Sequence, residues 1–181
     1  MTIIKDGTGS GYLAKVTPGN KLTTEAITEY IVADINKTQE QVYSVVVSQT
    51  PTGAGDCFCY AKNNSSLDMI LRSVTLAVTS DETIQIKIND IGTPVGGTAY
   101  IPINRNSGSA NTASGIFQTG NDITGLSGGS IVDQFFLKTG DSSLKYYWQS
   151  NIIIRPNDTL TFYAVTGAIA IKMSFAIYYR T

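Results

Sequence analysis

The stretch TIQIKIN, from Thr83 to Asn89, decides the fold class of this chain. Isoleucine occupies every second position, and polar residues fill the positions between. A period of two places the isoleucines on one face of a β-strand and the polar side chains on the other. We therefore predict a strand with one buried face and one face in water.

Similar patterns extend in both directions from this stretch. Further strands, bounded by Gly, Pro, Asn and Ser clusters, are predicted at Val42–Ser48, Asp56–Ala61, Asp68–Thr79, Thr98–Ile103, Ser130–Lys138, Leu144–Ile154, Thr159–Val165 and Ala168–Tyr179. The last of these has one continuous apolar face, formed by Ile169, Ile171, Met173, Phe175 and Ile177. We expect it to be central in its sheet. Pro102 predicts that the strand at Thr98–Ile103 lies at an edge or leaves the sheet there.

About nine or ten strands with turns between them predict an all-β fold, a β-sandwich. The long connections favour a jelly-roll-like or Greek-key arrangement over a meander. Residues 25–34 have a partial helical stripe, but their many β-branched side chains favour extended structure, so a short helix is the minority alternative. Residues 92–129 contain nine of the seventeen glycines. So long a connection is either functional or an ordered crossover.

Residues 1–33 have no sustained apolar period, and glycine occupies positions 7, 9 and 11. We predict an extended N-terminal arm over residues 1–33 and a single sandwich domain over residues 34–181. Ordering glycines costs backbone entropy, so the arm is expected to become ordered where a neighbouring subunit holds it. Strand addition by residues 12–16 or 21–25 to a sheet edge would use its candidate interface residues, which are Tyr12, Leu13, Val16 and Leu22.

The composition argues against several classes of partner. Thirteen basic and fourteen acidic residues give a net charge of −1, so we expect neither nucleic acid nor anionic lipid as a partner. We find no signal-peptide pattern and no membrane-length apolar run, and we expect folding in a cytosol. The charged fraction of 15% is low, and a surface rich in hydroxyls, amides and glycine suits contacts with other protein.

The sequence offers little for catalysis. It contains no histidine, which removes Ser-His-Asp and Cys-His nucleophiles and leaves Cys57 and Cys59 too few companions for a zinc site. The two cysteines are predicted to share a strand face, and we interpret them as small buried hydrophobes. The glycines at 7, 9 and 11 lack the helix N-terminus that would bind a phosphate. Acidic pairs such as Asp81-Glu82 fit solvated turns as well as an acid and a base. We therefore expect no catalytic residue, metal or cofactor.

The aromatic cluster Tyr146-Tyr147-Trp148 is a candidate for stacking on sugar rings. In a strand, Tyr146 and Trp148 share one face while Tyr147 takes the other. One of these faces is expected to be core, so we favour a structural role.

Three segments succeed one another along the chain: GTGSGYLAKV at 7–16 followed by NKL at 20–22, GGTAYIPINRNSGS at 96–109, and IIIRPNDTL at 152–160. In this order they resemble the N-terminal arm, the mid-chain Pro-x-Asn-x-x-Ser passage, and the strand, proline turn and strand of a group of tailed-bacteriophage virion structural proteins. The resemblance implies a jelly-roll-like virion subunit, commonly oligomeric and without enzymatic activity.

From this resemblance we expect a capsid decoration or cement protein, a homotrimer located in the virion after assembly in the host cytoplasm. Its partners would be the major capsid protein or other virion proteins, and Asn104, Arg105 and Asn106 join the arm residues as candidate interface residues. The alternative is a receptor- or carbohydrate-binding module on a tail or fibre, using residues 92–129 and the aromatics at 146–148. A tail or baseplate component with the same fold is a third possibility.

Overall fold

The computed structural model describes residues 3–5, 13–15, 31–139 and 144–180. The chain divides into two units, residues 1–31 and residues 32–181. In the first unit, β1 (Ile3–Lys5) pairs with β2 (Leu13–Lys15) in antiparallel register. The predicted arm therefore includes a small two-stranded sheet as well as residues outside the described part.

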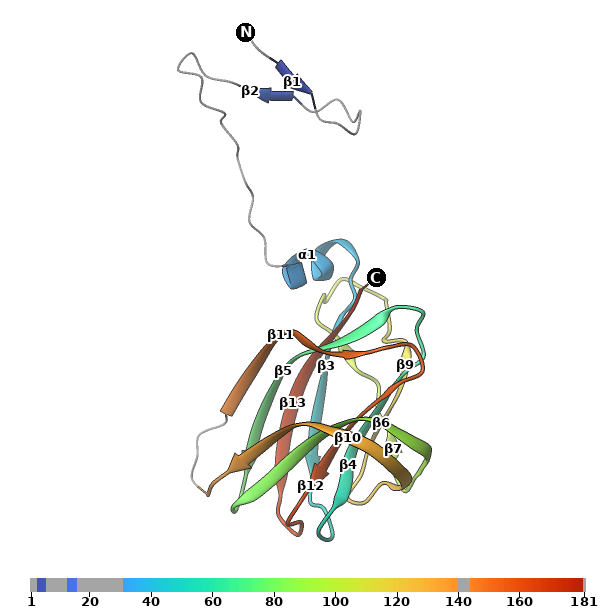
Figure 1. The fold of residues 1–181 in the computed structure, drawn as a ribbon, viewed down its shortest axis with the longest axis vertical. Helices are drawn as coiled ribbons and strands as arrows, with labels where there is room; N and C mark the ends of the chain where they lie inside the picture. The colour runs from blue at the N-terminus through green and yellow to red at the C-terminus, as the bar shows by residue number, and fades with distance from the viewer. Residues whose placement is uncertain (1–2, 6–12, 16–30, 140–143, 181) are drawn as a thin grey trace. The chain divides into compact units, whose positions relative to one another are not determined.

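Two antiparallel sheets make up most of the second unit (Figure 1). The five-stranded sheet has the order β11 (Leu144–Ile154), β5 (Asp68–Val78), β13 (Ile171–Arg180), β3 (Val42–Gln49) and β8 (Ile103–Asn104). The six-stranded sheet has the order β10 (Thr124–Leu137), β6 (Glu82–Val95), β12 (Thr159–Ala164), β4 (Asp56–Asn63), β9 (Gly115–Thr119) and β7 (Thr98–Ala99).

The strand order is that of a jelly roll. Apart from the short strands β7 to β9, the second unit contains eight strands in chain order, from β3 to β13. Numbered in that order, strands 1-8-3-6 form one sheet and strands 2-7-4-5 form the other. This is the double Greek-key arrangement of an eight-stranded jelly roll. The predicted jelly-roll-like β-sandwich is confirmed, and so is the central position of the last strand, β13, between β5 and β3.

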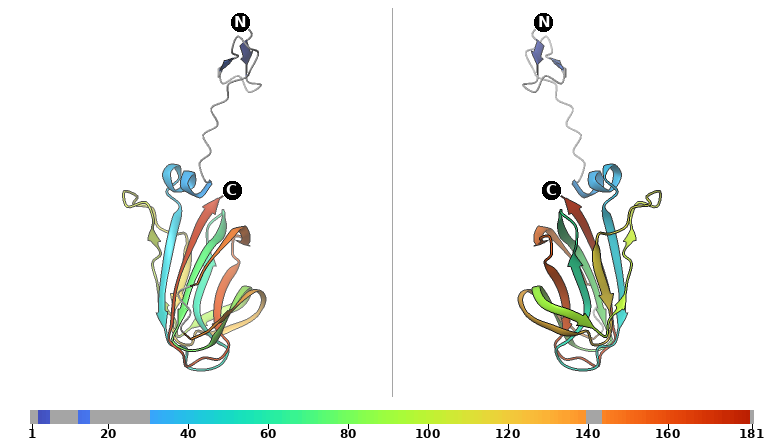
Figure 2. Two further views of the ribbon diagram at one scale, coloured as in Figure 1. Left: turned by 90° about the vertical axis from the view of Figure 1, so that its left-hand side faces the viewer. Right: turned by 90° about the vertical axis from the view of Figure 1, so that its right-hand side faces the viewer.

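The core lies between the two sheets, whose layers are visible in Figure 2. Phe162 of the six-stranded sheet packs against Phe175 of the other, with ring centroids 5.2 Å apart. Ile84 and Ile86 are fully buried, as the pattern of the opening stretch predicts. Burial of these apolar side chains is the main favourable contribution to folding.

A short helix, α1 (Ile31–Thr38), precedes β3 and lies at the end of the sandwich where β13 ends (Figure 1). The preference for extended structure was wrong at residues 31–34, while residues 25–30 of that stretch lie outside the described residues. Ile35 packs against Val42, Ile70 and Tyr178, and this tertiary contact outweighs the weak helix propensity of β-branched residues. The helix spans the boundary between residues 33 and 34 that the sequence suggested.

Residues 92–129 form an ordered crossover, one of the two outcomes that the sequence left open. The strand predicted at Thr98–Ile103 is instead two strands, with β7 paired to β9 of one sheet and β8 paired to β3 of the other. Pro102, which is buried between them, cannot donate to a ladder, so the chain leaves the first sheet as the sequence predicts. The Tyr100 hydroxyl accepts a 3.2 Å hydrogen bond from the backbone N–H of Val46 in β3. The crossover therefore links the edges of the two sheets.

Candidate functional site

Most of the candidate interface residues of the arm cannot be placed. Tyr12, Val16 and Leu22 lie outside the described residues. Leu13 begins β2, and its backbone pairs with Lys5 of the same chain. One edge of this strand is therefore occupied by β1, and a partner strand would have to add to the other edge. The role of these four residues stays a prediction.

Asn104 and Asn106 lie beside the end of α1 and the segment that follows it. The Asn106 amide donates to the carbonyl of Asn36 in the last turn of the helix at 3.2 Å, and the Asn104 amide donates to the carbonyl of Glu40, two residues after the helix, at 2.8 Å. The last carbonyl groups of a helix have no partner within the helix, so the Asn106 amide supplies one. The two asparagines thus attach the crossover to the helix and to the segment between the helix and β3.

Arg105 differs from its two neighbours. Its side chain is exposed, while its backbone N–H donates to the carbonyl of Val42 at 2.8 Å. Of the three candidates in this segment, Arg105 is the one that carries a charge, and its side chain lies at the surface. An interface role for the segment stays a prediction and would rest mainly on this guanidinium.

A groove of about 340 Å³ lies on the outer face of the five-stranded sheet. Small side chains in two rows across β3, β13 and β5 line most of it. One row contains Val46, Ser174 and Thr75, and the next contains Ser48, Lys172 and Ala77. The core-facing residues between them, such as Val45 and Phe175, are buried, so alternation places both rows on the outside. Hereafter this is the apolar groove.

Exposed aliphatic side chains border the apolar groove. Val46 is 53% exposed. Ile103 is 60% exposed and pairs with Ser44, which lies two residues before Val46 in β3. Paired residues of antiparallel strands share a face, so Ile103 lies on the same outer face as Val46. Among the described residues that line the groove, Lys172 is the one that carries a charge. This face therefore presents a small exposed apolar area beside the groove.

A buried polar cluster lies on the outer face of the other sheet. Asp90 is 5% exposed, and its carboxylate accepts hydrogen bonds from the Thr161 hydroxyl and, at 3.1 Å, from the Tyr163 hydroxyl. The Thr159 hydroxyl donates to the Asp90 carbonyl at 2.9 Å. Burial raises the pKa of Tyr163, which keeps its hydroxyl neutral and able to donate. These bonds attach β6 to β12 and give the buried Asp90 carboxylate its hydrogen-bond partners. This structural role explains why the polar side chains gather here.

Cys57 lies in the same region and Cys59 lies in the core. The prediction that they share a face was wrong, because the register between β4 and β12 shifts between Cys59 and Cys57. Such a β-bulge inserts one residue, here Phe58, and breaks the alternation. Their interpretation as buried small residues is confirmed, since both are free and buried. Burial raises the pKa of the Cys57 thiol to about 12, so the nucleophilic thiolate is scarce at neutral pH.

The aromatic cluster at residues 146–148 lies in β11. Tyr146 and Tyr147 pair through their backbones with Val74 and Ser73, at the edge of the five-stranded sheet. Their side chains are outside the described part of the chain, so a stacking role remains untested.

Over the ranges that the structure describes, no group of three or more His, Cys, Asp or Glu side chains is arranged to hold a metal ion. In the same ranges, no helix has the length and apolar character needed to cross a membrane. Comparisons with protein-family models, curated proteins and solved structures found no match to this chain.

Sequence reasoning missed the apolar groove. Its residues come from three strands that are distant in sequence, and each strand contributes only two or three ordinary surface positions. The groove arises from the strand order, in which β13 brings β3 and β5 together.

Proposed function

We propose that this protein is a non-enzymatic virion structural protein, a capsid decoration or cement protein that binds major capsid subunits and stabilises the particle. The observation that supports it best is the apolar groove on the outer face of a jelly roll. The core between the sheets is complete without this face, so the groove is free to serve another protein.

The chemistry of the groove suits a protein segment. Its floor of serine, threonine and alanine side chains leaves room for apolar side chains of a partner, and Val46 adds an apolar contact. Lys172 favours an acidic residue at the margin of that partner segment. Interface cores are depleted in charge and carry a polar rim, and the described lining of the groove, in which Lys172 alone is charged, matches this pattern.

A charge placed in the groove tests this role. We expect Val46→Asp to weaken binding to capsids depleted of the protein by at least about tenfold, which corresponds to roughly 1.4 kcal/mol. The carboxylate would replace an apolar contact and would have to give up its water on docking. Co-sedimentation with the capsids measures the affinity. The matched control is Ile91→Asp, at a 68% exposed position on β6 outside the groove. Equal binding by both variants and the unaltered chain would remove the groove from the proposal.

Deletion of the N-terminal residues tests the arm separately. We expect a variant lacking residues 1–28 to keep the sandwich fold, because among the described residues the core clusters are formed by residues from Ile35 onward. It should lose particle binding if the arm lies across capsid subunits or neighbouring copies. Circular dichroism measures the fold, and co-sedimentation measures the binding. Full binding by the truncated chain would contradict the arm's role.

Homotrimer formation and virion location belong to the same proposal. A monomeric mass in solution at high micromolar concentration would count against the trimer. The position of the chain in an electron-microscopy map of the assembled particle is the most decisive observation. Density on the tail or fibre would replace decoration of the capsid with the tail-associated alternative.

A further inference from the structure

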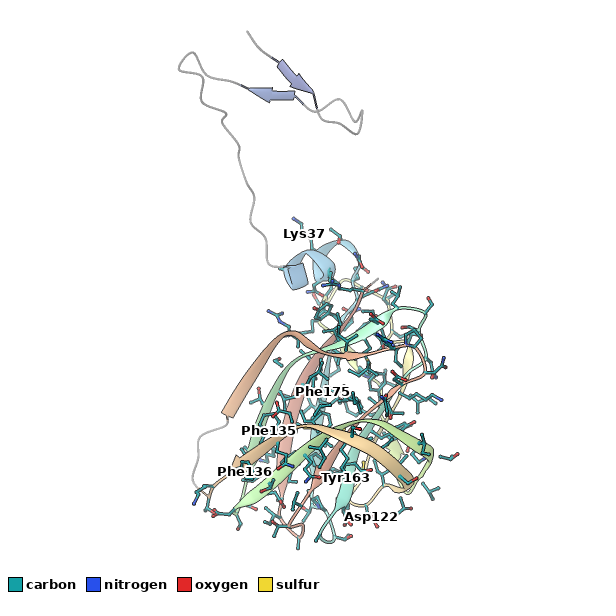
Figure 3. All side chains as sticks on the ribbon, in the orientation of Figure 1. Lys37, Asp122, Phe135, Phe136, Tyr163 and Phe175 are labelled. Atoms are coloured by element: carbon teal, nitrogen blue, oxygen red, sulfur yellow. The ribbon has the colours of Figure 1, made fainter. Side chains whose placement is uncertain are left out.

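A hollow of about 220 Å³ lies where β6 begins and β10 ends, on the sheet opposite the apolar groove. Phe136 lines it with 74% of its side chain exposed, while the preceding Phe135 is buried in the core (Figure 3). Phe136 pairs with Thr83 across the two strands. An aromatic ring at so exposed a position gains little from folding.

The floor of the hollow is rigidly built. Glu82 is 3% exposed, and one of its carboxylate oxygens accepts hydrogen bonds from the backbone N–H groups of Thr83 and Thr166, each at 2.8 Å. The other oxygen accepts from Gly167 N at 2.9 Å. Charge-assisted bonds of this kind are about twice as strong as neutral ones. Glu82 therefore fixes the backbone of the two threonines that line the hollow.

Charged groups complete the margin. One oxygen of Asp81 accepts from the backbone N–H of Thr139 at 2.8 Å and from its hydroxyl at 3.1 Å. These bonds lower the pKa of the Asp81 carboxyl, which is therefore ionised at neutral pH. A carboxylate accepts about four hydrogen bonds, so Asp81 has acceptor capacity left. Lys138, also lining the hollow, carries an ammonium group with three donors.

We propose that this hollow binds a hexopyranose ring of a glycan, with a C–H face of the sugar on Phe136 and its hydroxyl groups bonded to Thr83, Thr166 and Asp81. A pyranose has apolar C–H faces and a polar margin of hydroxyl groups. The face of an aromatic ring is negative and attracts the weakly positive C–H groups. Two threonines with a fixed backbone, a carboxylate and an ammonium line the hollow together with Phe136.

The same features disfavour a protein partner at this place. The core of a protein interface is depleted in charge and offers contiguous apolar area. The hollow instead combines a single aromatic ring with Asp81 and Lys138. The inference goes beyond the proposed function, because it concerns the other sheet and does not depend on capsid binding.

Titration of the full chain with methyl glycosides of glucose, galactose, mannose and N-acetylglucosamine, followed by NMR, tests the proposal. We expect at least one to bind saturably with a Kd on the order of 1–10 mM, as suits one small open site. Phe136→Ala should weaken that binding at least about tenfold, whereas Phe136→Tyr keeps the ring and should keep the binding within about threefold. Ile91→Ala, at another exposed apolar position, is the matched control and should change nothing.

Three results would overturn the proposal. The first is no saturable binding by any of the four glycosides at about 50 mM, well above the expected Kd. The second is equal binding by Phe136→Ala and the unaltered chain. The third is a lower oligomeric mass for Phe136→Ala without sugar binding by the unaltered chain, which would place Phe136 in a protein interface. Because Phe136 is exposed, its replacement should change stability by less than about 0.5 kcal/mol, so the variant remains folded for each measurement.

Discussion

Replacing Gly167 with alanine is expected to lower the free energy of unfolding by about 3–5 kcal/mol. Gly167 has a φ of 75°, in the left-handed region that side chains disfavour. A Cβ atom there would lie 1.9 Å from the carbonyl oxygen of Gly53 and 2.2 Å from its carbonyl carbon. Both are backbone atoms, so no side-chain rotation relieves the overlap. The backbone of one turn must move.

That movement would disturb several hydrogen bonds at once. The turn between β12 and β13 is joined to the turn between β3 and β4 by Ala168 N to Pro51 O and by Gly55 N to Ala164 O, each at 2.8 Å. Gly167 N also donates to the buried carboxylate of Glu82. Leaving a buried carboxylate short of donors is costly, which is why we place this effect among the largest for a single methyl group.

Gly55→Ala is the matched control. Its φ of 81° imposes a similar backbone strain, but nothing lies within 4 Å of the added Cβ atom. We expect a cost of about 1–2 kcal/mol from the left-handed conformation alone. Urea denaturation of both variants measures the difference. If the two substitutions cost the same, the close approach of the two turns has no energetic consequence.

Periodicity predicted the strands because alternation is a local property. The isoleucines at 84 and 86 are buried wherever the partner strands lie, since one face of any sandwich strand meets the core. The jelly-roll order itself depends on contacts between distant strands, such as β12 with β4 and β6. The sequence indicated the class through its long connections, whereas the strand order became visible only in the structure.

Two features differ from the sequence predictions, helix α1 and the β-bulge at Phe58, and each has a non-local cause. Helix α1 is stabilised by Ile35 packing onto Tyr178, more than a hundred residues later in the chain. The bulge at Phe58 is defined by its register with β12. Local propensity describes neither effect, because both depend on packing between segments.

The candidate sites also depend partly on local sequence and partly on contacts between distant segments. Asn104 and Asn106 are candidates because of their place in a motif, and the structure gives the Asn106 amide a partner on α1 and the Asn104 amide a partner in the segment after it. The exposed position of Phe136 has a local signal in the sequence. Adjacent aromatic residues in a strand point to opposite faces, so Phe135-Phe136 requires that one ring lie outside the core.

Replacing Asn63 with alanine is the second change expected to have a large effect, about 3–4 kcal/mol. Asn63 is fully buried, and its amide nitrogen donates to the carbonyls of Leu67 at 2.8 Å and Ile154 at 2.9 Å. Its amide oxygen accepts from the backbone N–H of Ser65 at 3.0 Å and from its hydroxyl at 2.7 Å. One side chain thus ties the end of β4 to the turn before β5 and to the end of β11.

Alanine would leave the buried Ile154 carbonyl without its hydrogen-bond partner and remove the acceptor of the Ser65 N–H, while the Leu67 carbonyl keeps its bond from the Ser65 hydroxyl at 2.8 Å. The desolvation cost is greatest at Ile154, which is 1% exposed, because Ser65 and Leu67 are half-buried. Asn64→Ala, at the exposed next position, is the control and should change stability by less than about 0.5 kcal/mol. Thermal and urea unfolding of both variants give the comparison. A loss below about 1 kcal/mol for Asn63→Ala would mean that water enters and replaces the amide. The end of β4 would then depend on its backbone bonds to the turn after β11, which are Asn63 N to Asp158 O and Asn157 N to Asn63 O, while β5 is held to β11 by their strand pairing.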